Sequence, residues 1–330
     1  MKKYILVLLI IHLVIPSKSQ GVIFDSVSFN SALQFPVERT SFPDRYSLAS
    51  YVPAQRFPQT GGTCVAMSLA MARTILFAIE NNITDKDKIT VYQMSPYFIY
   101  YLARDKTDHL CAKGLDIIHA AFKVKENGAA HMYQVEYKNH YPFTNDFLCP
   151  KKYDYYPPEL INNLESALAN RINEVYTTKS ISGIKAALSN NLPVVLAMQI
   201  PKSFEQLKTG LWEPRQHENK LNAIGGHAVV AIAYDDNLFG GAIKIVNSWG
   251  DDWGNRGMAW IRYRDLPYWL DVGVILEPIQ TRYNKEMGDL KVNEPLQTEL
   301  KPSKFNIKNF NTNFKFDNKK LLQSFNNFFR

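Results

Sequence analysis

The residues with the clearest chemical potential lie in three short segments that are far apart in the sequence. In the first, Gly61-Gly62-Thr63-Cys64 leads directly into a stretch with helical spacing. A cysteine at the start of a helix lies where backbone N–H groups and the helix dipole stabilise a thiolate. The preceding glycines let the backbone approach a bound molecule closely. Because a buried free cysteine is more often a small core residue, this segment alone leaves nucleophile and core residue both open.

The second and third segments supply a base and its partner. His227 follows two glycines at the mouth of an apolar strand, and such a strand gives a general base a fixed position. Asn247 ends another buried strand and begins the run Asn-Ser-Trp-Gly-Asp-Asp-Trp-Gly. We expect its side-chain carbonyl to accept the Nδ1–H of His227, which leaves Nε2 facing the thiol, with Trp249 shielding that bond from water. Taken singly, a structural histidine and a glycine turn packed by aromatic residues are the competing interpretations.

In this order the three segments resemble the papain-like cysteine peptidases. The motifs that carry the resemblance are Gly-Thr-Cys64, Gly-Gly-His227-Ala-Val and Asn247-Ser-Trp-Gly-x-x-Trp-Gly, of which the third is the most specific. Cys64 precedes His227 by 163 positions and Asn247 by 183, somewhat above the usual ~130–150. Insertions around residues 129–160 and 201–222 account for the excess. The resemblance covers roughly residues 47–277 and implies an α+β, two-lobe fold with a helical left lobe, which carries the nucleophile helix, and an antiparallel, barrel-like right lobe.

The resemblance also implies a role for each residue. Cys64 would be the nucleophile, His227 the base and then the acid, and Asn247 the residue that orients the histidine. Gln59 would donate to the oxyanion together with the Cys64 backbone N–H, and a thiolate–imidazolium pair would lower the pKa of the thiol. The expected function is peptide-bond hydrolysis through a thioester acyl-enzyme. The alternatives are an amidase or transferase acting on cell-wall peptides, and a non-catalytic binding protein on the same scaffold, against which the intact triad argues.

The sequence departs from the family pattern near the nucleophile. Gln59 lies five residues before Cys64, whereas the family places its glutamine six before, so Gln55 is an alternative oxyanion donor. Val65 stands where tryptophan is common, and Thr63 where serine is usual. The segment before the domain is also too short for the usual long inhibitory pro-segment, which leaves export or the C-terminal tail to control activity.

Substrate preference follows from the resemblance only in outline. The subsite before the scissile bond would involve residues near Ala223, Ile224 and Gly226. Their small apolar character favours an apolar substrate side chain, while the choice between endopeptidase and exopeptidase action stays open.

The elements that must position these residues are helix-rich in the first half of the chain and strand-rich in the second. Thr63 is expected to cap a helix from Cys64 to about Asn81, and Ser95-Pro96 to begin a second helix. The remaining predicted helices lie at 115–126, 158–172 and 181–188, and the predicted strands at 193–200, 228–234, 242–246, 258–263 and 272–276. Segregated helices and strands predict an α+β protein of two lobes.

The two ends of the chain differ from its body. A basic start, an apolar run over 4–16 and Ser17-Lys18-Ser19 are typical of a cleavable signal peptide over residues 1–19, so we expect a secreted or periplasmic protein. Residues 20–46 form a lead-in segment, 47–280 the catalytic domain, and 281–330 a tail rich in Asn, Phe and Lys.

The cysteine count and the charge limit the function classes. Three cysteines are an odd number for an exported protein, and pairing of Cys111 with Cys149 would leave Cys64 free. The formal charge of +7 comes from the two ends of the chain, so the body offers no case for nucleic-acid binding. We expect a peptide or protein substrate, no cofactor, no metal site, no stable membrane anchor and a monomer. The Lys-Lys start leans toward a bacterial exported protein.

Overall fold

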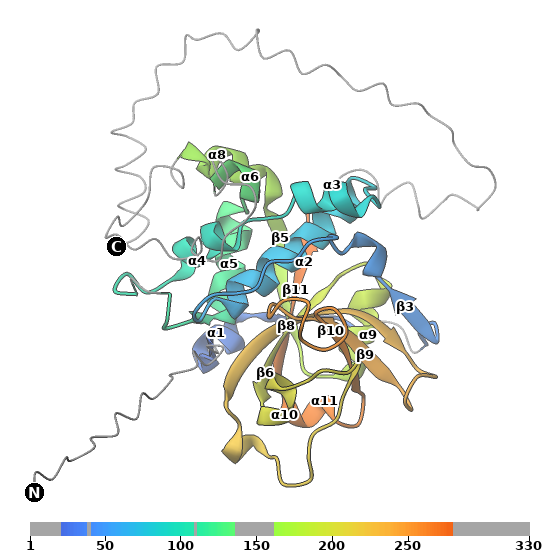
Figure 1. Cartoon of the computed structure of the whole chain (residues 1–330). Coiled ribbons are helices and arrows are strands. Elements are labelled where there is room, and N and C mark those ends of the chain that lie inside the picture. The colour runs from blue at the N-terminus through green and yellow to red at the C-terminus, as the bar shows by residue number, and fades with distance from the viewer. Residues whose placement is uncertain (1–20, 38–40, 109–110, 136–161, 280–330) are drawn as a thin grey trace, which may run out of the picture. The chain divides into compact units, whose positions relative to one another are not determined.

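The structure, a computed structural model, describes residues 21–37, 41–108, 111–135 and 162–279 (Figure 1). These residues belong to one compact unit that ends at Thr281. The unit has the two-lobe α+β architecture that the sequence predicted, with helices gathered in the left lobe and most strands in the right lobe. The predicted signal peptide and the tail from 281 onward lie outside the described residues.

The left lobe is built around one long buried helix, α2 (Cys64–Glu80). Its alanine-rich sequence favours a helix and lets neighbouring elements pack closely. The one buried charge on it, Arg73, is neutralised by Glu80 at 3.0 Å and also donates to the Asn170 carbonyl at 2.8 Å. The other helices of this lobe are α3 (Lys86–Val91), α4 (Pro96–Ala103), α5 (Ile117–Asn127), α6 (Met132–Val135) and α8 (Leu164–Ala167).

The right lobe is a nine-stranded, mainly antiparallel sheet, and Figure 1 shows its strands curling around a core. Its strand order is β2-β5-β11-β6-β8-β9-β10-β7, with β3 paired to β8. The fully buried core of this lobe includes Phe204, Trp212, Trp253 and Trp269. The bounds are β2 (Leu33–Gln34), β3 (Arg45–Ser47), β5 (Ile172–Thr178), β6 (Val194–Ile200), β7 (Leu211–Trp212), β8 (Gly225–Asp235), β9 (Ala242–Val246), β10 (Met258–Arg262) and β11 (Leu270–Pro278), with the helices α9 (Ile181–Ser189), α10 (Lys202–Glu205) and α11 (Leu266–Trp269) alongside.

Most predicted elements are confirmed to within a few residues. The exceptions are the helix predicted over 158–172, of which the described part holds α8 and a 3-10 helix over Leu168–Asn170, and strand β5, which the sequence did not predict. The predicted cap of α2 is also wrong: the Thr63 hydroxyl donates to the Thr60 carbonyl at 2.8 Å and makes no capping bond. The physical reason is the Thr63 backbone, whose ψ of 8° is not the extended conformation of a capping residue.

The lead-in segment forms regular structure although its sequence shows no periodicity. Strand β1 (Val22–Ile23) pairs in parallel with β4 (Leu115–Asp116) of the left lobe. Helix α1 (Ser26–Ser31) follows, capped by the Asp25 carboxylate, and β2 and β3 then join the right-lobe sheet. The lead-in therefore contacts both lobes.

Two further features concern the cysteines and the helices. Cys111 is disulfide-bonded, Cys64 carries a free thiol, and Cys149 lies outside the described residues. None of the helices in the described part of the chain has the length and apolar content needed to cross a bilayer.

Candidate active site

Cys64 is the first residue of α2 and is fully buried. The loop before it is held by the disulfide-bonded segment, because the Gly62 N–H donates to the Cys111 carbonyl at 2.7 Å. Helix α2 packs against β8, and hydrogen bonding from the Ala228 backbone reaches the thiol. The structure thus brings Cys64 next to the strand that carries His227.

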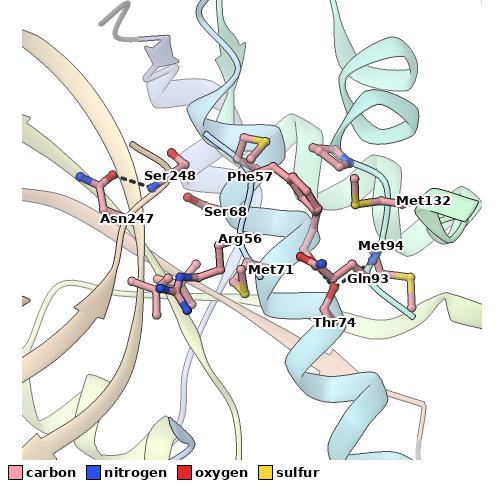
Figure 2. Close-up of a pocket in the computed structure, with 15 residues that line it drawn as sticks. Arg56, Phe57, Ser68, Met71, Thr74, Gln93, Met94, Met132, Asn247 and Ser248 are labelled. Atoms are coloured by element: carbon pink, nitrogen blue, oxygen red, sulfur yellow. Dashed lines mark hydrogen bonds between the residues drawn. The ribbon is translucent and has the colours of Figure 1, made fainter. Parts of the chain in front are cut away.

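His227 lies near the start of β8, opposite Met198 of β6, and its side chain is buried. Its Nε2 lies 2.7 Å from the Asn247 Oδ1 atom. That oxygen also accepts the Ser248 backbone N–H at 2.7 Å, so it acts as an acceptor and the proton belongs on Nε2 (Figure 2). The expectation that Asn247 would hold Nδ1 and leave Nε2 toward the thiol was wrong. The ring is turned the other way because β9 delivers the asparagine to its Nε2 side.

Trp249 covers the histidine. The two rings are stacked, with centroids 4.3 Å apart and an interplanar angle of 26°, and only 5% of Trp249 is exposed. Phe204 packs edge-on against Trp249, with ring centroids 5.9 Å apart, and against His227, with centroids 6.3 Å apart. An indole over the His227–Asn247 bond excludes water from it, which strengthens the bond.

Gln59 lies beside the asparagine loop of the opposite lobe. Its backbone N–H donates to the Ser248 carbonyl at 2.7 Å, and its Oε1 accepts the Ser248 hydroxyl at 2.6 Å. The Nε2 group lies 3.2 Å from the Gly61 carbonyl, in the loop that leads to Cys64. Gln55, the other candidate, is exposed, and its backbone N–H donates to Thr90 of α3 at 3.2 Å. The geometry therefore favours Gln59 over Gln55 as the glutamine near the thiol.

A small interior cavity lies behind these loops, between the lobes. Its volume is about 30 Å³, room for a water molecule but not for a substrate. Figure 2 shows Ser68, Met71 and Thr74 of α2 on one side of it and Asn247 with Ser248 on the strand side. Arg56, on the loop that carries Gln59, lines it as well.

Comparison with known proteins places this site in a family. Residues 58–266, more than half of the chain, match the papain family cysteine protease description, and that span holds Cys64, His227, Asn247 and Gln59. The chain belongs to the papain family.

Individual relatives of this papain-family chain are distant. An uncharacterized peptidase C1-like protein of Acanthamoeba polyphaga mimivirus is 27% identical over 220 residues, which are 63% of this chain and 62% of that protein. The chain thus spans about three-fifths of that relative's length. Xylellain, a cysteine protease from Xylella fastidiosa, shares the fold with a TM-score of 0.61 and 20% identity, over 79% of this chain and 97% of xylellain. Procathepsin B S9 from Trypanosoma congolense gives a TM-score of 0.60 and 17% identity, over 80% of this chain and 87% of its own.

The papain-family thiol is covered by the chain's own lead-in. The Gly21 N–H donates to the Cys64 Sγ at 3.3 Å, and the Gly21 carbonyl accepts the Leu115 N–H at 2.8 Å. The fit permits no side chain, because a Cβ on Gly21 would lie 1.9 Å from the Gly62 carbonyl oxygen. The next residue, Val22, lies against Gly226, whose own Cβ would lie 3.1 Å from the Val22 carbonyl oxygen. We call residues 21–23 the covering strand.

Burial of Cys64 beneath the covering strand also affects the pKa of its thiol. Burial raises the pKa of Cys64, and hydrogen bonding from the Gly21 and Ala228 backbones only partly opposes it. The expectation of a lowered pKa was therefore wrong for this form of the protein. Its physical cause is the exclusion of water by the strand packed on the sulfur, which disfavours the thiolate.

Two residues of this site were not singled out from the sequence. Ser248 could have been identified from the Asn-Ser-Trp motif, in which it directly follows Asn247. No sequence feature identifies Gly21, because its position against Cys64 depends on the pairing of β1 with β4, 93 positions along the chain. Ala223 and Ile224, named for the substrate subsite, lie partly buried against the core directly before β8.

Proposed function

We propose that this papain-family protein is a cysteine-type peptidase that hydrolyses peptide bonds through a thioester at Cys64. The observation that carries the proposal is the arrangement of a free cysteine at the N-terminus of α2 beside β8, whose His227 is fixed by Asn247 and covered by Trp249. A free thiol, a positioned imidazole and an orienting amide are the parts that nucleophilic catalysis by cysteine requires.

The reaction follows from the positions of the protons. With Nε2–H donated to Asn247, Nδ1 of His227 takes the thiol proton of Cys64 as the sulfur attacks the substrate carbonyl. Gln59 Nε2 and the Cys64 backbone N–H stabilise the resulting oxyanion. The imidazolium returns the proton to the amine, which leaves, and a thioester remains. Water, deprotonated by His227, then hydrolyses the thioester and restores the thiol.

The described form is latent in this proposal. A substrate carbonyl must reach Cys64 Sγ, which the covering strand occupies through Gly21. Displacement or removal of residues 21–23 therefore precedes catalysis. In this proposal the lead-in is a third possible means of controlling activity, besides export and the C-terminal tail.

Location and preference complete the proposal. Residues 1–19 act as a signal peptide that exports the enzyme from a bacterial cell, so it meets its protein substrates outside the cytoplasm. The apolar surface near Ala223, Ile224 and Gly226 selects an apolar side chain, and a peptide-library profile that prefers charged residues at this subsite would refute that preference.

The proposed activity is tested with fluorogenic peptides on the wild type and on the variants Cys64→Ala and His227→Ala. We expect turnover by the wild type after the covering strand is displaced, and a loss of at least about 10³-fold in either variant. Turnover of cell-wall amides without turnover of other peptides would show that the protein is an amidase and not a general peptidase. Equal turnover by wild type and Cys64→Ala would rule out the thioester mechanism.

A further inference from the structure

A second, larger cavity lies between the lobes, and Arg56 lines it as well as the small one. Its volume is about 740 Å³, within the range of sites for small molecules, about 300–1,000 Å³. The left lobe contributes the loop 53–56 and the first residue of α3, Lys86. The right lobe contributes Lys244 of β9 and the loop after Trp253, which includes Arg256. The function proposed above makes no use of this cavity.

The charged groups around this cavity are mostly of one sign. Four cationic side chains line it, from Arg56, Lys86, Lys244 and Arg256, against the single carboxylate of Asp251. Asp251 already forms an ion pair with Arg56, in which the Arg56 Nη2 lies 2.7 Å from the Asp251 Oδ1. Among the described residues, the other three cations form no ion pair at 4.0 Å or less.

The carboxylate that precedes Lys86 in the sequence is already engaged elsewhere. Asp85 precedes Lys86, but its Oδ1 accepts the Asp87 and Lys88 backbone N–H groups at 3.0 and 3.2 Å as the cap of α3. Lys244 also lies 5.6 Å from the centroid of the Trp260 ring, a contact that leaves its charge in place. Three cations that line one hollow without a carboxylate partner repel one another, and an anion placed between them relieves that repulsion.

We propose that this interlobe cavity binds a small phosphate-bearing anion with two adjacent phosphoryl groups. Guanidinium and ammonium groups are donors without acceptor capacity, which matches the acceptor-only oxygens of a diphosphate. The flat fork of Arg256 suits bidentate contact, and Lys86 and Lys244 act as point charges from the two lobes. Because the cations come from both lobes, two phosphoryl groups give each lobe its own set of acceptor oxygens.

Arg56 connects this anion site to the candidate active site. Its Nη2 donates to the Arg256 carbonyl at 2.7 Å as well as to Asp251. The next carbonyl, of Gly257, accepts the Asn247 N–H at 2.9 Å. An anion that competes with Asp251 for Arg56 therefore changes the support of the loop that fixes Asn247. This part of the inference rests on the proposed function.

Isothermal titration of inorganic pyrophosphate into the full chain carrying Cys64→Ala tests the site without requiring activity. We expect one molecule bound per chain, with affinity at least about tenfold weaker when Lys86→Gln and Lys244→Gln are combined, since two charge-assisted contacts are lost. Arg256→Gln, a separate exposed position, is expected to weaken binding as well. The matched control combines Lys106→Gln with Lys202→Gln, which removes the same charge away from the cavity.

Each outcome decides the matter. Unchanged affinity in both cavity variants, equal weakening in the control, or no detectable binding overturns the site. In the active wild type, pyrophosphate is expected to change kcat, and the Lys86→Gln, Lys244→Gln variant is expected to lose that response. Binding with the predicted pattern but an unaltered kcat overturns the link through Arg56. Binding by a chain that turns over no peptide supports the site and counts against the proposed function instead.

Discussion

At the scale of single residues, the site depends on one amide oxygen that accepts two hydrogen bonds. Asn247 Oδ1 receives both the His227 Nε2–H and the Ser248 N–H at 2.7 Å. The second bond fixes the amide, and the amide fixes the ring. This arrangement makes Nδ1 of His227 the atom that exchanges protons with Cys64 in the proposed mechanism.

Replacing Asn247 by Ala is expected to lower kcat/KM by about 10- to 100-fold. The change leaves the buried Nε2–H without its acceptor, at a cost of about 1–3 kcal/mol. Steady-state kinetics with one peptide substrate provide the measurement. Asn173→Ala is the control, because the exposed Asn173 side chain on β5 donates to the Glu277 carboxylate at 2.6 Å, outside the candidate active site. An Asn247→Ala enzyme with wild-type kcat/KM would show that the histidine needs no orienting group.

Replacing Ser248 by Ala is expected to lower kcat about fivefold with little change in KM. The variant loses the hydrogen bond to Gln59 Oε1, worth about 1 kcal/mol, so the glutamine amide is less often aimed at the oxyanion. Gln59→Ala sets the upper limit of this effect. The role of Ser248 fails if its variant lowers kcat in a Gln59→Ala background as strongly as in the wild type.

At the scale of elements, the position of the covering strand could not be predicted from the sequence. Strand β1 contains two residues and has no periodicity; its position comes from pairing with β4 and from the fit of Gly21 against Gly62. A contact with the thiol of this kind depends on tertiary packing, which local propensity does not encode.

The Gly21→Ala variant tests the covering strand with a single methyl group. Its Cβ would lie 1.9 Å from the Gly62 carbonyl oxygen, so we expect the strand to leave the thiol. Alkylation of Cys64 by iodoacetamide at pH 7 should then accelerate about tenfold or more. Burial raises the thiol pKa, so labelling of the wild type begins at higher pH than for an ordinary cysteine, and exposure moves the profile to lower pH.

A matched glycine provides the control for that variant. A Cβ on Gly210 would meet its nearest neighbour, the Asn255 Cβ, at an ordinary 3.6 Å, so Gly210→Ala should label like the wild type. If Gly21→Ala labels at the wild-type rate with the same pH profile, the strand does not protect the thiol.

Whether the other elements could be predicted depends on whether local sequence patterns specify them. Helix α2, helix α4 with its Ser95 cap, and strands β6, β8 and β9 follow from local periodicity and turn signals, and the sequence predicted them. Strand β5 was not predicted: the predicted helix over 158–172 reached only its first residue, Ile172, and residues 173–178 were assigned to no element. The catalytic candidates were predictable because their motifs are short and contiguous. The ring orientation of His227 was not, since it depends on where β9 ends relative to β8.

At the scale of the whole two-lobe unit, a few polar links join the lobes next to the site. Gln59 bonds Ser248 at 2.6 Å, and Arg56 pairs with Asp251 at 2.7 Å. Farther away, Lys125 of α5 bonds Glu174 of β5 at 2.6 Å. Because Ser248 directly follows Asn247, we expect the Gln59–Ser248 link to affect activity as well as stability.

The Lys125–Glu174 link is expected to make stability depend on pH. The hydrogen bond from Lys125 lowers the pKa of Glu174 below its ordinary 4.5. Its stabilisation is therefore fully present above pH 4.5 and lost as the pH falls through the lowered native value. We expect Glu174→Gln to have a lower Tm than the wild type near neutral pH and a similar Tm in stronger acid.

Thermal unfolding from pH 7 down to about pH 3 measures this difference. Glu165→Gln, on the exposed part of α8, provides the control and should follow the wild type at every pH. A constant difference in Tm between Glu174→Gln and the wild type across the whole range would exclude the link as a pH-dependent contribution.

The role of Cys64 as the nucleophile is tested most directly by treating the protein at neutral pH with an epoxide that alkylates active-site thiols and then measuring the mass of the protein. Wild type, Gly21→Ala and Cys64→Ala would be compared, with peptide turnover measured on the same samples. We predict a single adduct on Cys64 that forms slowly on the wild type and rapidly on Gly21→Ala, together with loss of turnover, and no adduct on Cys64→Ala. Turnover that survives complete labelling of Cys64, or an adduct of equal yield on Cys64→Ala, would contradict Cys64 as the nucleophile.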